Sequence, residues 1–150
     1  MLSVNDVNWT ETLSFRLGAL GAVISDQYAE ELAEVGLKPK HVGVLGVLDA
    51  GLASSQLEIA RLMRVAPSLV VSLADHLESK GAIQRLRDPA DRRRQVLLLT
   101  DEGRALLGRC TGMALALDAR LAAALTPSQQ AALRDALDRL AVAYDLPARE

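Results

Sequence analysis

The strongest chemical signal in the sequence is a cluster of arginines. Three of them occupy residues 92–94, and Arg85 and Arg87 come shortly before. Guanidinium groups bind phosphate oxygens. Arginines at the tip of a loop can also enter the minor groove of DNA, where narrow A·T tracts concentrate negative potential. From Arg61 to the end of this cluster the chain has eight basic and four acidic residues, although its net charge is −2. We therefore predict a region that binds a polyanion. On charge alone, a solvated charged face is the other explanation.

Residues that support catalysis or bind a metal are scarce. The chain has two histidines, His41 and His76, and one cysteine, Cys110. No nucleophile–base pair, metal-ligand cluster or phosphate-binding loop is visible, so we predict no enzyme activity, no cofactor and no metal site. Cys110 falls on the apolar stripe of a predicted helix, which favours a packing role over a redox role.

Length and composition favour one mainly helical domain. The chain has 150 residues, of which 50% are hydrophobic and only 3% aromatic. Leu, Val and Ala must therefore fill the core, and Leu and Ala favour helices. No apolar run approaches the roughly 18–20 residues that a membrane helix needs, and no secretory signal is visible. We expect a cytoplasmic protein without a membrane partner.

Apolar periodicity predicts two helices in the first third of the chain. The first runs roughly over residues 10–35 and ends at Gly36, in the position of a left-handed cap. The second begins near Pro39, a residue suited to an early helical position, and ends near Gly51.

The next two helices are short and closely spaced. A capping box from Ser55 to Glu58 begins one of them, which should bury Ile59, Leu62 and Met63. The other begins at Pro67, places Leu69, Val70, Leu73 and Leu77 inward, and ends at Gly81. Two short helices joined by a tight turn form a helix-turn-helix.

A hairpin and two further helices follow. Residues 83–87 and 95–99 are strand-prone, and the segment between them contains proline and aspartates, which favour a loop. Thr100 caps a long helix, whose apolar stripe is Leu106, Cys110, Met113, Leu117, Leu121 and Ala124. A capping box at Thr126 begins the last helix, which should bury Leu133, Leu137 and Leu140.

These elements predict a mostly α fold with a small β-hairpin wing. We expect a single domain over residues 1–150, in which residues 37–100 form a winged helix-turn-helix lobe. The helices of residues 1–36 and 101–150 have more apolar surface than this lobe can cover. We therefore predict a homodimer joined through helices from both ends of the chain.

The sequence resembles the MarR family of bacterial transcriptional regulators. The resemblance is carried by LEIARLMRV and by LADHLESKGAIQRLRDPADRRRQVLLLTDEG, within residues 57–103. The segment DPADRRR, followed by Leu99, Thr100 and Gly103, is similar to the wing signature of that family. The resemblance implies a winged-helix dimer that binds pseudo-palindromic operators, usually as a repressor released by a small ligand. The start of the recognition helix, Ala66 to Leu69, departs from the polar or basic residues common in the family.

The predicted DNA-binding residues lie on the recognition helix and the wing. On the helix, serines can donate to phosphates or base edges, and a valine can contact a thymine methyl group. The wing arginines would reach phosphates or the minor groove, and Asp91 would brace an arginine. The predicted set is Ser68, Val71, Ser72, His76, Arg85, Arg87, Arg92, Arg93 and Arg94.

The resemblance also implies a ligand site between the dimerisation helices and the winged lobe. Arg16, at a position similar to an effector-binding arginine of relatives, could bind a carboxylate in a two-pronged manner. His41 could donate to a phenol or carboxylate, and Trp9 and Phe15 could supply ring contacts. The alternatives are a core histidine at His41 and a salt bridge at Arg16.

We therefore expect a homodimeric DNA-binding regulator, a repressor released by a small ligand, for which an anionic aromatic compound is the candidate class. The alternatives are a winged-helix dimer that binds DNA constitutively, or one that binds only protein, with no effector in either case.

Overall fold

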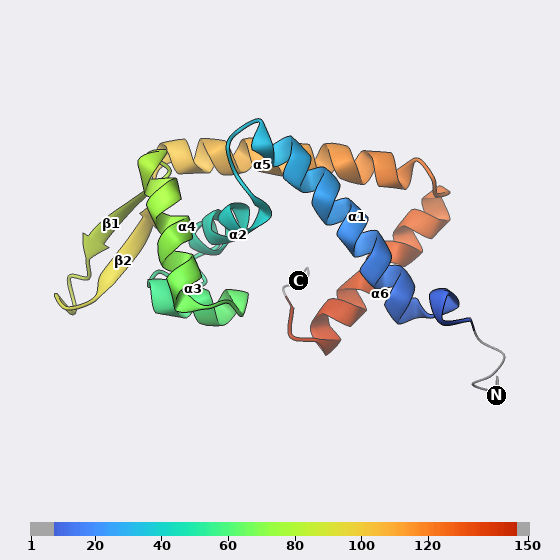
Figure 1. Cartoon of the computed structure of the whole chain (residues 1–150), viewed down its shortest axis with the longest axis horizontal. Helices are drawn as coiled ribbons and strands as arrows, with labels where there is room; N and C mark the ends of the chain where they lie inside the picture. The colour runs from blue at the N-terminus through green and yellow to red at the C-terminus, as the bar shows by residue number, and fades with distance from the viewer. Residues whose placement is uncertain (1–7, 147–150) are drawn as a thin grey trace. The chain divides into compact units, whose positions relative to one another are not determined.

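The structure confirms the mainly helical fold with one hairpin. It is a computed structural model that describes residues 8–146 (Figure 1). The elements in chain order are η1 (Trp9–Glu11), α1 (Leu13–Ala33), α2 (Pro39–Asp49), α3 (Gln56–Met63), α4 (Pro67–Ser79), β1 (Ile83–Arg87), β2 (Gln95–Leu99), α5 (Asp101–Ala122) and α6 (Pro127–Ala143).

The helix ends follow the signals read from the sequence. Gly36 and Gly81 have φ angles of 69° and 71°, the left-handed region that favours glycine. Ser55 caps α3 and Thr126 caps α6, each within a complete capping box. The Oγ1 of Thr100 accepts from the backbone N–H of Gly103 and so caps α5.

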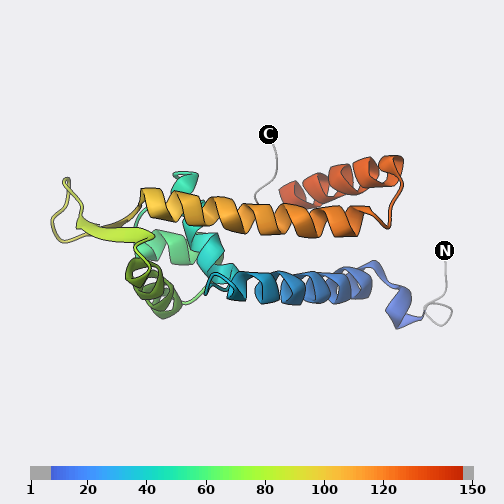
Figure 2. The same cartoon turned by 90° about the horizontal axis from the view of Figure 1, so that it is seen from above.

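β1 and β2 form an antiparallel hairpin, which we call the wing. Their register pairs Ile83 with Leu99 and Arg87 with Gln95. The backbone N–H of Leu97 donates to the carbonyl oxygen of Ser54, which ties β2 to the segment before α3. The wing extends away from α3 and α4 (Figure 2).

The described residues fall into two compact units, and the boundary lies within α5, after Ala114. The first unit has a buried core to which each of its main helices and strands contributes. Its fully buried side chains include Leu32, Val44, Leu45, Ile59, Val70, Leu77, Ile83, Leu97 and Cys110. The second unit consists of the end of α5 together with α6. None of the helices in residues 8–146 is long and apolar enough to cross a membrane.

Four leucines that were predicted to be buried are exposed in the single chain. Leu62 is exposed, because the inward side of the short α3 is centred on Ile59 and Ala60, and Leu62 lies off that line. Leucines of α6 were predicted to be buried but are exposed in the single chain, as are those of α1. The exposed leucines are Leu133, Leu137 and Leu140 on α6, and Leu13, Leu17 and Leu20 on α1.

Candidate nucleic-acid interface

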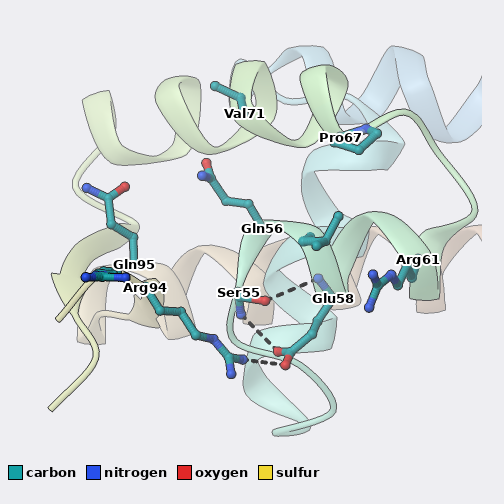
Figure 3. A pocket seen from close by; sticks show the side chains of 10 residues that line it. Ser55, Gln56, Glu58, Arg61, Pro67, Val71, Arg94 and Gln95 are labelled. Atoms are coloured by element: carbon teal, nitrogen blue, oxygen red, sulfur yellow. Dashed lines mark hydrogen bonds and ion pairs between the residues drawn. The ribbon is translucent and has the colours of Figure 1, made fainter. Parts of the chain in front are cut away.

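A groove of about 650 Å³ lies between α3, α4 and the wing. It combines charged, polar and apolar side chains from all three elements (Figure 3). The residues that line it include Gln56, Glu58, Arg61, Val71, Arg93 and Arg94.

Helix α4, the predicted recognition helix, buries one face and presents the other. Val70, Leu73, Ala74 and Leu77 point into the core, which fixes the rotation of the helix. Ser68, Val71 and Ser72 are exposed on the opposite face. Pro67 begins the helix without a side-chain cap at Ala66, so the first turn presents backbone N–H groups.

His76 does not lie with the exposed reading face, contrary to the prediction. Its Nε2 donates to the carbonyl oxygen of Gly36 at 2.7 Å, since a carbonyl can only accept. Its ring stacks on His41, with the ring centroids 4.5 Å apart. The physical reason is that the loop after α1 places the Gly36 carbonyl within reach of this turn of α4. His76 therefore holds α4 to that loop.

Arg85 is also placed differently from the prediction that it contacts phosphate. Its guanidinium lies 2.5 Å from both the Asp75 and the Glu78 carboxylates of α4. It also donates to Gln56 Oε1 at 3.3 Å and to the carbonyl oxygen of Val71 at 3.4 Å. Burial alone would lower the pKa of Arg85, but its bonds to the two carboxylates outweigh burial, so the pKa is raised. Both terminal nitrogens of the guanidinium thus have partners within the protein.

Arg94 is turned back toward α3 and does not extend from the wing tip as predicted. It pairs with Glu58 and lies 3.9 Å from the Asp88 carboxylate. Backbone N–H groups of Ser55 and Ser54 hydrogen-bond to Glu58 and, with Arg94, lower its pKa to about 2. The Glu58 carboxylate is thus charged at neutral pH, and it holds the base of the wing loop against α3.

Asp91 has a different partner from the guanidinium that the sequence suggested. Its Oδ1 accepts from the backbone N–H of Arg93 at 3.0 Å, and its carbonyl oxygen accepts from the N–H of Arg94. This short-range pattern is an Asx-type turn, which aspartate forms with its own following backbone. Asp91 therefore shapes the wing tip through the main chain.

Three of the predicted arginines remain available to a ligand. Arg87, Arg92 and Arg93 are exposed, and no ion pair is described for them within residues 8–146. Arg93 lines the groove, as does Arg61 of α3, which is exposed. Arg61 and Arg93 thus lie across the groove from the exposed face of α4.

Sequence reasoning overlooked the acids that organise this surface. Asp75 is four residues after Val71, so its place on the outward face of α4 could be read from helical spacing. The pairing of Arg85 with Asp75 and of Arg94 with Glu58 could not, because each pair joins elements that only the fold brings together.

The predicted effector residues do not gather at one place. His41 lines a cavity of about 510 Å³ with Ser25, Lys38, Lys40, Leu69 and Ser72. Arg16 is exposed on α1, nine residues before Ser25, which separates the two by roughly 13 Å along the helix. Trp9 lies on η1 and Phe15 in the first turn of α1, with their ring centroids 4.5 Å apart.

His41 is buried, and its lowered pKa keeps the ring uncharged at neutral pH. Its Nδ1 accepts from the backbone N–H of Lys38 at 2.8 Å, which caps α2. Burial, followed by the positive potential of His76, Lys38 and Lys80, lowers the pKa of His41 to about 4. The buried Cys110 has a raised pKa because of desolvation, which favours an unreactive thiol.

Comparisons with known proteins agree with this geometry. The model of the MarR family matches residues 35–94. The HTH-type transcriptional repressor Rv2887 of Mycobacterium tuberculosis is 31% identical over 128 residues, which cover 85% of this chain and 92% of that protein.

Solved structures extend the likeness over nearly the whole chain. CouR of Rhodococcus jostii RHA1, bound to a 23-mer DNA duplex, is similar with a TM-score of 0.77 and 30% identity, covering 94% of this chain and 99% of that one. Rv2887 in complex with p-aminosalicylic acid has a TM-score of 0.73 at 30% identity, covering 86% and 98%. With its wing, its helix order and these matches, the chain belongs to the MarR family of winged-helix, DNA-binding transcriptional regulators.

Proposed function

We propose that the protein is a homodimeric repressor whose operator binding is released by a small anionic ligand. The observation that carries this proposal is the exposed face of α4 beside free arginines on the wing and α3. The repressor names of its relatives and the DNA duplex bound by CouR support the same conclusion.

In this proposal the residues divide into those that read bases and those that bind the backbone. Ser68, Val71 and Ser72 would enter the major groove, where hydroxyls reach base edges and a valine can contact a thymine methyl group. Arg87, Arg92 and Arg93 would bind phosphates or the adjacent minor groove, as would Arg61. Arg85, Arg94 and His76 would act within the protein.

The proposed dimer uses the exposed apolar faces of α1 and α6. Proteins of this family are dimeric, and exposed leucine stripes of this length mark association surfaces. Residues 37–100 would be the DNA-binding lobe, and residues 1–36 and 101–150 the dimerisation helices. Two lobes related by a twofold axis would read half-sites about one helical turn apart. Such a regulator works in the cytoplasm, where its DNA lies.

The cavity that contains His41 is the proposed effector site. Lys38 and Lys40 supply positive charge, His41 a neutral ring, and Leu69 an apolar wall. Because Ser72 of α4 lines the same cavity, a bound ligand would shift the recognition helix. Rv2887 and CouR were solved with p-aminosalicylic acid and p-coumaroyl-CoA, which supports an anionic aromatic class. A second candidate effector site, separate from this cavity, would consist of Arg16, Trp9 and Phe15.

A gel shift tests the proposal. DNA from immediately upstream of the gene is compared with unrelated DNA of equal length at two salt concentrations, and aromatic carboxylic acids are then added. We expect competitor-resistant binding that weakens steeply with salt and is released by an acid. Equal, weak binding to both DNAs would contradict a specific regulator of its own gene. Specific binding that no acid releases would favour a constitutive DNA-binding protein.

A further inference from the structure

Arg85 connects the wing to the recognition helix more extensively than any other described side chain of the wing. It lies on β1, and its guanidinium reaches both carboxylates of the second half of α4, Asp75 and Glu78. It also reaches Gln56 at the start of α3 and the carbonyl oxygen of Val71. Its side chain is only 17% exposed, although both carboxylates face solvent.

These contacts fall on the same stripe of α4 as a predicted base-reading residue. Val71, Asp75 and Glu78 are spaced by four and three positions, so they lie along one side of the helix. The carbonyl that Arg85 contacts belongs to Val71 itself. The rotation of α4 about its axis, and its position along that axis relative to β1, therefore depend on one guanidinium with fixed geometry.

Isolated surface ion pairs contribute little, but the arrangement of Arg85 differs from an isolated pair. Its planar group engages two carboxylates at 2.5 Å and two further oxygens from two helices. Arg87 lies two positions further along β1, on the same face of the strand, and no ion pair is described for it within residues 8–146. The two arginines thus provide a matched pair, one occupied within the protein and one free.

We propose that Arg85 is a positioning residue for sequence recognition, fixing α4 against β1 so that the reading face and the wing meet DNA in one relative orientation. This inference rests on the proposed DNA-binding function. A base-reading helix discriminates only while it is held in place, whereas phosphate attraction tolerates small rotations. We call the contacts of Arg85 with Asp75 and Glu78 the clamp. Loss of the clamp should therefore reduce discrimination between DNA sequences more than overall attraction to DNA.

The experiment compares wild type with Arg85→Gln, Arg87→Gln, the double variant Asp75→Asn/Glu78→Gln, and the triple variant that combines this pair with Arg85→Gln. The probes are a duplex selected from a random library by the wild-type protein and an unrelated duplex of equal length. Dissociation constants for both are measured over a range of salt concentrations. The first readout is the specificity ratio, which is the dissociation constant for the unrelated duplex divided by that for the selected duplex. The second is the salt slope, which is the magnitude of the slope of log affinity against log salt concentration.

For Arg85→Gln we expect the ratio to fall about tenfold, the cost of roughly one mismatched base pair, with the salt slope unchanged. For Arg87→Gln we expect weaker binding to both duplexes, an unchanged ratio and a salt slope lower by about 1 per protomer.

The double variant separates positioning from charge. If the two carboxylates act only as negative charges, removing them should tighten binding to both duplexes. The clamp predicts that the ratio falls as in Arg85→Gln, and that the triple variant shows no further fall. Because Asp75 and Glu78 are 64% and 42% exposed, this variant should fold even if Arg85→Gln does not, which thermal unfolding will check.

A wild-type ratio in a folded Arg85→Gln variant would overturn the inference. So would tighter binding of the double variant with its ratio retained, or additive losses in the triple variant. If the wild-type protein selects no sequence from the library, the proposed function itself fails, and the inference fails with it.

Discussion

At the scale of single residues, the wing arginines differ in what their guanidinium groups contact. Arg85 and Arg94 are paired with carboxylates of the same lobe, whereas Arg93 is exposed and lines the groove beside α4. A paired guanidinium must give up its partner before it can bind phosphate, and this costs free energy. Sequence proximity therefore does not make these arginines equivalent.

Arg93→Ala should weaken binding to every DNA sequence by a similar factor. No ion pair is described for its side chain within residues 8–146, and loss of a phosphate contact carries little sequence information. A salt titration should show a slope lower by about 1 per protomer. Arg109→Ala, an equal loss of charge at an exposed position on α5, is the control and should bind as wild type. Wild-type affinity in Arg93→Ala would remove the wing tip from the interface.

His41 should make the stability of the lobe depend on pH. Burial, His76, Lys38 and Lys80 lower its pKa to about 4 from the ordinary value of 6.5. Between these values the folded chain binds fewer protons than the unfolded chain. The stabilisation is therefore complete above pH 6.5 and is lost as the pH falls toward 4.

Denaturant unfolding of wild type and His41→Gln across this pH window measures the effect. We expect the free energy of unfolding to fall more steeply with acid in the wild type than in the variant. Parallel curves for the two proteins would show that His41 titrates normally in the folded state.

At the scale of elements, the start of α5 is constrained by a close approach to the residue before β1. A Cβ added at Gly103 would lie 2.0 Å from the carbonyl oxygen of Ala82, the same oxygen that accepts from the N–H of Thr100. This is the physical reason for a glycine at the end of the wing signature. The helix that begins here contributes the buried Leu106 and Cys110 to the core.

Gly103→Ala should destabilise the protein by about 1–3 kcal/mol, because α5 must move away from Ala82 or lose its first turn. Thermal unfolding monitored by circular dichroism measures the change. Gly108→Ala, at a position of the same helix with open space around it, is the control and should be neutral or stabilising. Equal stability of the two variants would contradict the close approach.

At the scale of the whole molecule, the single chain leaves apolar surface uncovered on α1 and α6. Leu17 is 50% exposed and Leu137 is 48% exposed, each within a stripe of leucines at helical spacing. Fully burying one such side chain contributes about 1.5–3 kcal/mol, so two stripes supply a strong tendency to associate. The proposed dimer would cover them.

Leu17→Glu should convert the protein to a monomer and weaken operator binding, because one lobe reads only one half-site. Sedimentation velocity measures the mass in solution, and the gel shift measures the binding. Ala22→Glu adds the same charge half a turn around α1 and should leave the dimer intact. A dimeric Leu17→Glu variant would place the association surface elsewhere.

The sequence by itself determined the order of elements and most of their ends. Capping boxes, helix-ending glycines in the left-handed conformation, and the hairpin all depend on residues within a few positions of one another. It also identified the groove region, because the basic excess and the wing signature are contiguous in the chain. The predicted effector-binding residues do not lie together in the structure. The resemblance that suggested both Arg16 and His41 specified no distance between them.

Only the tertiary structure decided which charged and polar groups are occupied. Arg94 pairs with Glu58, 36 residues away, and His76 binds the carbonyl of Gly36, 40 residues away. Arg85 of β1 likewise contacts Gln56 of α3 and Asp75 of α4, which are distant in the sequence. Ion pairs and hydrogen bonds depend on distances of a few ångströms between groups, and the packing of the buried core sets those distances.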